Sequence, residues 1–166
     1  MSDQGTTFAA FLKDELEAER KRREAHDERG FEVVKTTGTL VTLVLGFAAV
    51  VLGTDYRPHS QLVVIFVSLA LLVLVVSTGF ALAATQLLRY SVTDKTGLDE
   101  ILNDRWESTE PTARGTVAQL SAKRIDNLRT GNDKKADRLA RAHWLQLIGL
   151  ALLVLTVVAE VASRAF

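Results

Sequence analysis

The sequence predicts an all-α integral membrane protein with three transmembrane helices whose cytoplasmic extensions form a helical bundle. Three stretches carry no charged side chain, namely residues 36–54, 60–88 and 142–159. A helix needs roughly 20 largely apolar residues to cross a hydrocarbon core about 30 Å thick, and these stretches are near or above that length. A long helix in a soluble core normally keeps a polar face, whereas residues 62–76, LVVIFVSLALLVLVV, are apolar on all sides.

The expected segments alternate between the cytoplasm and the membrane. In order they are a cytoplasmic polar helix over residues 1–34, transmembrane helix one over 35–54, an outer loop over 55–60, transmembrane helix two over 61–88, a cytoplasmic helical segment over 89–142, transmembrane helix three over 143–163 and an outer tail over 164–166. Lys and Arg residues decide the orientation, because in short loops they tend to stay in the cytoplasm. They are frequent in the two cytoplasmic segments, whereas the outer loop holds only Arg57 and the tail only Arg164. We therefore expect the N-terminus in the cytoplasm and the C-terminus outside.

Two helices are expected to continue from the cytoplasm into the membrane. Residues 6–29 contain no proline or glycine and are rich in helix formers, so this helix should enter the first span, with Gly30 as a soft point. Pro111 suits a first helical turn. From there we expect one helix through the third span, because a single glycine such as Gly131 costs only about 1 kcal/mol.

The cytoplasmic extensions should pack as antiparallel helices through their apolar faces. On the N-terminal helix that face consists of Phe8, Phe11, Leu12 and Leu16. The side chains expected to face inward from the later segment are Leu98, Ile101, Trp106, Val117, Leu120, Ile125, Leu128 and Leu139.

A stripe of small and hydroxylated residues follows a lysine along the first span. Its members, spaced three or four apart, are Lys35, Thr39, Thr42, Gly46, Ala49 and Gly53. Small residues let helices approach closely in lipid, so one interpretation is a seam packed against the second or third span. The other is the lining of a pore with Lys35 at its inner mouth, because an ionisable residue in a membrane points to function. Similar stripes predict seams on the other spans: Ser77, Ala81, Ala84 and Thr85, and Gly149, Thr156, Ala159 and Ser163.

Composition and motifs argue against an enzyme. The 166 residues include no cysteine, so a disulfide, a thiol nucleophile and a thiolate zinc site are all excluded. His26, His59 and His143 show no metal spacing, and Glu160, the one acid in a span, is expected to pair with Arg164. The sequence contains no HExxH motif or phosphate-binding glycine loop. Acids balance the basic runs, which makes poor nucleic-acid patches. We expect no catalytic site, no metal, no cofactor and no nucleic-acid partner.

Two stretches resemble a bacterial family. They are EAHDERGFEVVKTTGTLVTLVLG and QLSAKRIDNLRTGNDKKADRLARAHW. They resemble the small membrane effectors of nucleotide-signalling antiphage systems, namely the Pycsar-type transmembrane effector domain and the related SLATT domains. The similar positions are Ala25, Asp27, Arg29, Gly30 and Gly38 in the first stretch, and Asn127, Asn132, Lys134 and Lys135 in the second.

The resemblance implies a non-enzymatic effector of the bacterial inner membrane that oligomerises and permeabilises the bilayer, with a cyclic nucleotide as its trigger. The expected partners are then lipid and further copies of the chain. The candidate ligand or partner surface is Asp27, Arg29, Asn127, Asn132, Lys134 and Lys135. The alternative function is a membrane-anchored scaffold whose cytoplasmic helices bind another protein, and a third is a subunit of a transport complex.

Overall fold

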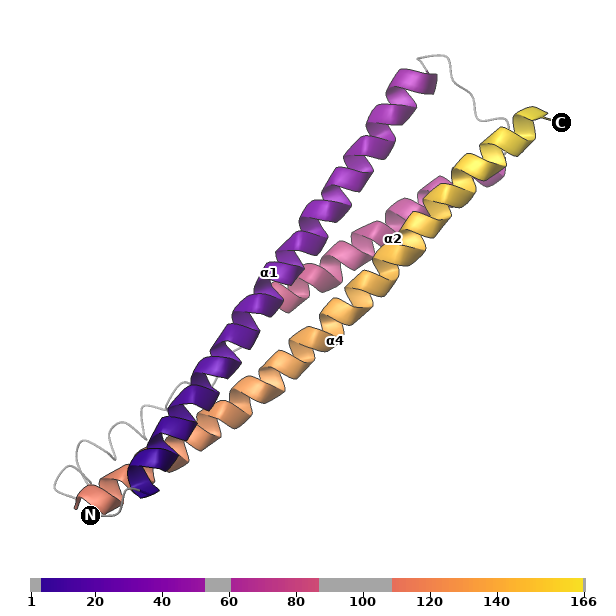
Figure 1. Cartoon of the computed structure of the whole chain (residues 1–166). Coiled ribbons are helices and arrows are strands. Elements are labelled where there is room, and N and C mark those ends of the chain that lie inside the picture. Colours follow the sequence, from indigo (N-terminus) through magenta and orange to yellow (C-terminus); the bar gives the residue numbers. More distant parts are fainter. Residues whose placement is uncertain (1–3, 53–60, 87–108, 166) are drawn as a thin grey trace. The chain divides into compact units, whose positions relative to one another are not determined.

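The described part of the chain is entirely helical (Figure 1). The computed structural model describes residues 4–52, 61–86 and 109–165, and residues 4, 47–52, 164 and 165 are described by their backbone alone. They form three helices, α1 (Gln4–Leu52), α2 (Gln61–Thr85) and α4 (Glu110–Ala165). The predicted all-α class is confirmed for these residues.

Helix α1 is continuous over 49 residues, as predicted, and passes Gly30 without a break. Its polar portion is supported by ion pairs along its own surface, such as Lys21 to Glu17 at 2.9 Å. This hydrogen bond, together with the charge of Lys21, holds the pKa of Glu17 below its usual value, and the same contact raises the pKa of Lys21. The contact stabilises an exposed helix that has little apolar surface of its own.

Helix α4 is continuous over 56 residues and passes Gly131 without a break, which confirms the single long helix. Pro111 lies in its first turn, where the missing N–H group has no helical partner to lose. Glu110 suits the positive end of the helix dipole and accepts a hydrogen bond from Arg114 at 2.6 Å.

The helices contribute to two compact units. The first, which we call the polar unit, comprises Met1–His26 and Leu87–Lys134, and its described residues are 4–26 and 109–134. The second, the apolar unit, comprises Asp27–Gln86 and Lys135–Phe166, and contains all of α2. Each unit therefore includes a part of α1 and a part of α4.

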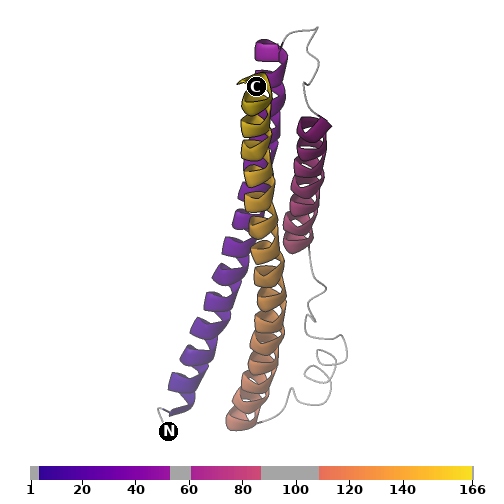
Figure 2. The ribbon, with the colours of Figure 1, turned by 90° about the vertical axis from the view of Figure 1, so that its right-hand side faces the viewer.

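In the apolar unit, α2 runs opposite to α1 and α4 (Figures 1 and 2). One small cluster joins the helices through Val33, Ala81 and Ala142, and a second through Ala70, Leu74 and Leu153. In the polar unit, α1 and α4 also run parallel, since Glu15 and Glu19 both contact Arg129 and the later Arg22 contacts Asp133. The expected antiparallel packing of the cytoplasmic extensions is therefore wrong for the described extensions, those of α1 and α4.

Small residues make the contacts between helices in the apolar unit. Ser77, Ala81 and Ala84 of α2 are buried, which confirms the seam predicted on this helix. A side chain at Gly30 would meet the Thr85 methyl group at 2.5 Å, and one at Gly149 would meet Leu74 at 2.7 Å. Glycine at these two positions lets the helices approach closely.

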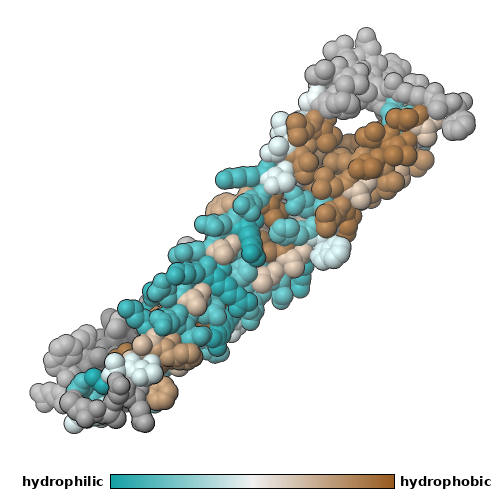
Figure 3. All heavy atoms as spheres, in the orientation of Figure 1, coloured by the Kyte–Doolittle hydropathy of each residue, from teal (hydrophilic) through white to brown (hydrophobic). Residues whose placement is uncertain are grey.

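Two of the described helices are long and apolar enough to cross a membrane, within Gln61–Thr85 and Glu110–Ser163. In the most apolar 18-residue stretch of each helix, only 22% and 17% of the residues, respectively, are buried. Figure 3 shows hydrophobic side chains on the surface of the visible face of the apolar unit. A lipid bilayer would solvate this surface, which supports the prediction of a membrane protein. The predicted first span continues beyond Gly46 into residues whose side chains are outside the described set.

The predicted inward-facing side chains are partly confirmed. Ile125, Leu128 and Leu139 are buried and Leu120 is half-buried. Val117 is 59% exposed, so its inward placement was wrong. The reason is that the described polar unit has only two helices, and Val117 lies beside their contact instead of within it. The remaining three, Leu98, Ile101 and Trp106, lie outside the described residues.

Leu128→Asp should lower the stability of the polar unit far more than Val117→Asp. Burying a large apolar side chain contributes roughly 1.5–3 kcal/mol, and the aspartate also places a charge in an apolar contact. Val117 is already exposed and serves as the matched control. The measurement is the melting temperature of the purified protein in detergent. Equal shifts for the two variants would contradict the contact between α1 and α4.

Gly149→Ala should lower the melting temperature, whereas Gly79→Ala should raise it or leave it unchanged. The new methyl group at Gly149 would lie 2.7 Å from buried Leu74, while nothing lies within 4 Å of the same position at Gly79. At an open helical position alanine gains up to about 1 kcal/mol over glycine. A stabilising effect of Gly149→Ala would show that α2 and α4 do not approach as closely as described.

Candidate functional site

A network of polar side chains joins α1 to α4 in the polar unit. Asn132, which has no exposed surface, donates from Nδ2 to the backbone carbonyl and to the carboxylate of Glu19, both at 2.9 Å. Arg129 donates to the other carboxylate oxygen of Glu19 at 3.0 Å and also bonds Glu15. Nearby, Arg22 pairs with Asp133 at 2.9 Å. The network places five charged groups and one amide where the two helices meet.

These contacts favour the charged form of Arg129. The hydrogen bond to Glu19, followed by the charges of Glu15 and Glu19, raises the pKa of Arg129 further, although desolvation opposes the shift. An arginine is already charged throughout the physiological range. Glu19 is buried but accepts hydrogen bonds from Arg129 and Asn132, so its carboxylate is satisfied without solvent.

In the apolar unit, two cations of α4 bind the other helices. Lys135 has no exposed surface, and its ammonium donates to the carboxylate of Asp27 on α1. Arg138 donates from Nη1 to the backbone carbonyl of Ala83 at 2.6 Å. Ala83 lies in the last turn of α2, where carbonyl groups lack helical partners and a cation is favourable. One turn further along α4, the Ala142 carbonyl accepts a hydrogen bond from Ser77 at 2.7 Å.

Some of the six residues of the candidate ligand surface therefore lie between helices, and others are exposed. Asn132 and Lys135 lie in helix contacts, where they bind Glu19 and Asp27, and neither has surface to offer a ligand. Arg29 and Lys134 are exposed and Asn127 is half-buried. The contacting residues Glu19, Arg129 and Arg138 were missed. Their partners lie far away in the sequence, so no local motif identifies them.

The stripe on α1 points away from the other described helices. Lys35, Thr39 and Thr42 are exposed, and nothing lies within 4 Å of a side chain built at Gly46. The two threonine hydroxyls donate to carbonyls of their own helix, at 3.0 and 2.9 Å. Of the remaining members, Ala49 is described by its backbone alone, and Gly53 lies outside the described residues.

A different face of α1 makes the intrachain contacts. It carries Val33, Val34, Val41 and Val44, which pack in the two clusters of the apolar unit. The described members of the stripe therefore do not form the expected seam with α2 or α4. The predicted seam on α4 begins at Gly149, which is buried, while Thr156, Ala159 and Ser163 are half-buried.

The described residues contain no group of three or more acidic, histidine or cysteine side chains that could hold a metal. His26 is buried, and His143 is exposed with its Nδ1 2.9 Å from the Leu139 carbonyl oxygen. His59 and the side chain of Arg164 lie outside the described set, and so does the expected pair of Arg164 with Glu160.

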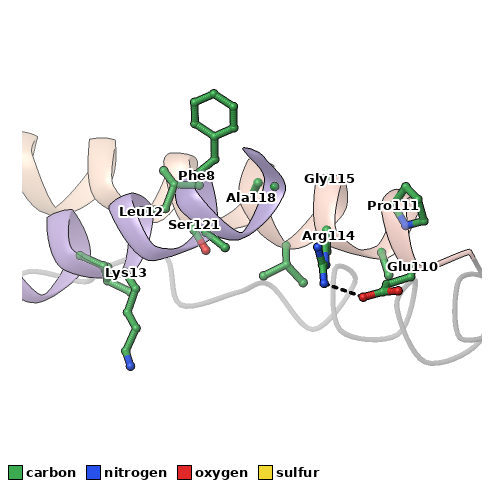
Figure 4. Close-up of a pocket in the computed structure, with 14 residues that line it drawn as sticks. Phe8, Leu12, Lys13, Glu110, Pro111, Arg114, Gly115, Ala118 and Ser121 are labelled. Carbon is green, nitrogen blue, oxygen red and sulfur yellow. Dashed lines mark hydrogen bonds and ion pairs between the residues drawn. The ribbon is translucent and has the colours of Figure 1, made fainter. Parts of the chain in front are cut away.

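An apolar groove opens in the polar unit between the first turns of α1 and those of α4 (Figure 4). It has a volume of about 790 Å³. Phe8, Leu12 and Leu16 line it from α1, and Val117 and Ala118 from α4. The sequence placed Phe8, Leu12 and Leu16 on one face together with Phe11, but Phe11 is exposed and does not line the groove. The groove itself was not predicted, because Val117 was expected to be buried.

Comparisons with protein-family models, with curated proteins and with solved structures gave no match to this chain. A functional assignment therefore depends on the contacts and the exposed surfaces described above.

Replacing either member of the Lys135–Asp27 pair should destabilise the apolar unit more than replacing both. Asp27→Asn leaves the Lys135 ammonium, which has no exposed surface, without its counter-charge. Removing one partner of a buried ion pair typically costs about 3 kcal/mol or more. The double variant Asp27→Asn with Lys135→Met removes the buried charge as well. Melting temperatures of the single and double variants form the test. Strictly additive losses would contradict a coupled pair.

Proposed function

We propose that this chain is a non-enzymatic membrane protein that assembles with further copies of itself and permeabilises a bacterial inner membrane when triggered. In this proposal α1, α2 and α4 each cross the bilayer, with the N-terminus in the cytoplasm and the C-terminus outside. The observation that carries the proposal is the stripe of α1, whose described members Lys35, Thr39, Thr42 and Gly46 are all exposed.

The stripe is unusual for a surface that faces lipid. On the same part of α1, Leu43 and Leu45 are also exposed, and their side chains are large and apolar. In a bilayer the hydrophobic effect does not draw helices together, so association depends on close backbone approach. Thr39, Thr42 and Gly46 permit that approach, and all three are exposed in the described part of the chain. A second copy of the chain is the partner that such a face suits best.

Lys35 adds a charge at the start of the stripe. In a single copy its exposed side chain would extend to the lipid headgroups at small cost. In a ring of copies the same lysines would gather near one mouth of the assembly, and rings of charge select ions. This supports membrane permeabilisation over a passive anchor.

A cyclic nucleotide as trigger is supported by the resemblance to nucleotide-signalling effectors. Since Asn132 and Lys135 are used between helices, an anionic ligand would have to bind exposed cations such as Arg29 or Lys134. The groove of the polar unit favours the second candidate function, a scaffold that binds another protein through its cytoplasmic helices.

Gly46→Leu should disrupt the assembly, because the larger side chain would hold the α1 helices of two copies apart. Gly79→Leu is the matched control, since this glycine is also open and lies on α2, away from the stripe. The measurements are oligomer size in detergent and dye leakage from liposomes. Loss of both with Gly46→Leu alone supports a shared seam. An intact oligomer with altered leakage supports a pore lining.

A protein that remains monomeric and never leaks, with or without cyclic nucleotides, would contradict the proposal and favour the scaffold. Equal effects of Gly46→Leu and Gly79→Leu would show that the stripe has no special role.

A further inference from the structure

Each helix of the apolar unit carries one polar side chain in the middle of the face that packs against the other helices. The members of this face are spaced three or four residues apart. They are Gly30, Val33, Thr37, Val41 and Val44 on α1, Ala70, Leu74, Ser77, Ala81 and Ala84 on α2, and Leu139, Ala142, Gln146, Gly149 and Leu153 on α4. Every other member is glycine or apolar, so Thr37, Ser77 and Gln146 are the exceptions on these three helices.

The three polar side chains lie in one layer of the unit. Along each helix, the polar residue lies between a residue that packs in the Val33 cluster and one that packs in the Leu74 cluster. The Ser77 hydroxyl donates to the Ala142 carbonyl at 2.7 Å. In an α-helix that carbonyl also accepts from the N–H group of residue 146. Ser77 therefore lies beside the turn of α4 that carries Gln146.

The Thr37 hydroxyl is the least satisfied group of this layer. Thr37 is only 3% exposed, and its Oγ1 atom has no hydrogen-bond partner among the described residues. Thr39 and Thr42 on the same helix instead bond carbonyls of their own helix. A buried hydroxyl without a partner is unfavourable. Ser77 can still accept a hydrogen bond, and the amide of Gln146 can both donate and accept.

We propose that Thr37, Ser77 and Gln146 together bind an internal water molecule between the three helices of the apolar unit. The water accepts a hydrogen bond from Thr37 and donates to the side-chain oxygens of Ser77 and Gln146. An internal water typically makes about three hydrogen bonds to buried polar groups. Thr37 and Ser77 are short, and the long, flexible amide of Gln146 can adjust to admit one water.

The charges of the apolar unit favour water over a cation as the ligand. Residues 36–54, 60–88 and 142–159 carry no charged side chain, so these stretches offer a cation no counter-charge. An isolated charge in an apolar interior is costly, whereas a neutral water needs only hydrogen bonds. The site also does not depend on the proposed assembly, because all three residues belong to one copy of the chain.

Thermal unfolding in detergent tests the site through the direction of a shift. Thr37→Val keeps the shape of the side chain and removes the hydroxyl. It should lower the melting temperature, because the water would lose a partner, whereas an unpaired hydroxyl would make the same change stabilising. Thr36→Val, at an exposed position, is the matched control and should have little effect. Combining Thr37→Val with Gln146→Met should cost less than the sum of the two single losses, because both remove the same water.

Solid-state NMR of the full-length protein in liposomes detects the water itself. Magnetisation that starts on water should build up rapidly on the side-chain amide of Gln146, a signal that Gln146→Met identifies. It should build up slowly on the methyl groups of Leu74, which is 1% exposed and serves as the dry reference. Thr37→Val should slow the build-up at Gln146 severalfold.

Four results would overturn the proposal. A higher melting temperature for Thr37→Val would show that its hydroxyl has no ligand. Strictly additive losses would show that Thr37 and Gln146 share none. Coupled losses with slow build-up at Gln146 would assign a direct bond between the side chains. Rapid build-up that Thr37→Val leaves unchanged would show that water reaches Gln146 from elsewhere.

Discussion

The buried ammonium of Lys135 is the constraint on which the contact of α1 with α4 depends in the apolar unit. An ammonium without solvent contact costs several kcal/mol unless a counter-charge is close. Asp27 provides that charge across a sequence separation of 108 residues, and this fixes which turns of the two helices face each other. Small apolar clusters could slide by a turn at modest cost, but this pair could not. In the polar unit Glu19 fixes the facing turns of α1 and α4 in the same way, because it binds both Arg129 and Asn132.

The rest of the apolar unit follows from that fixed contact. The helices are joined mainly by small residues, and the buried hydroxyl of Ser77 and the guanidinium of Arg138 bind backbone carbonyls of neighbouring helices. Such contacts suit a bilayer, where close approach and hydrogen bonds hold helices together. These contacts also bury the face of α1 that carries Val33 and Val41. The stripe containing Thr39, Thr42 and Gly46 is left outside, which is why a second copy is its natural partner in the proposed assembly.

The sequence predicted the long helices well, because their length follows from local properties. Helix formers, the absence of internal proline and tolerance of single glycines extend α1 and α4 past Gly30 and Gly131. The seam on α2 was also predicted. The contacting face of α1 was not, because valines in a membrane helix suit both lipid and a helix contact, and only the fold shows that Val33 and Val41 are the ones used. The partners of Lys135 and Asn132 could not be predicted, since pairing depends on the register of distant segments.

In the proposed assembly, the stripe of α1 meets another copy of the chain while its valine face stays within the chain. Cysteine cross-linking in native membranes tests it most directly, since the wild-type chain has no cysteine. Thr42→Cys, at an exposed position, should give disulfide-linked dimers. Val41→Cys is next to it in sequence but packs against the cluster of Ala70, Leu74 and Leu153, and it should not. Equal dimer yields from the two variants, or none from Thr42→Cys, would contradict the account.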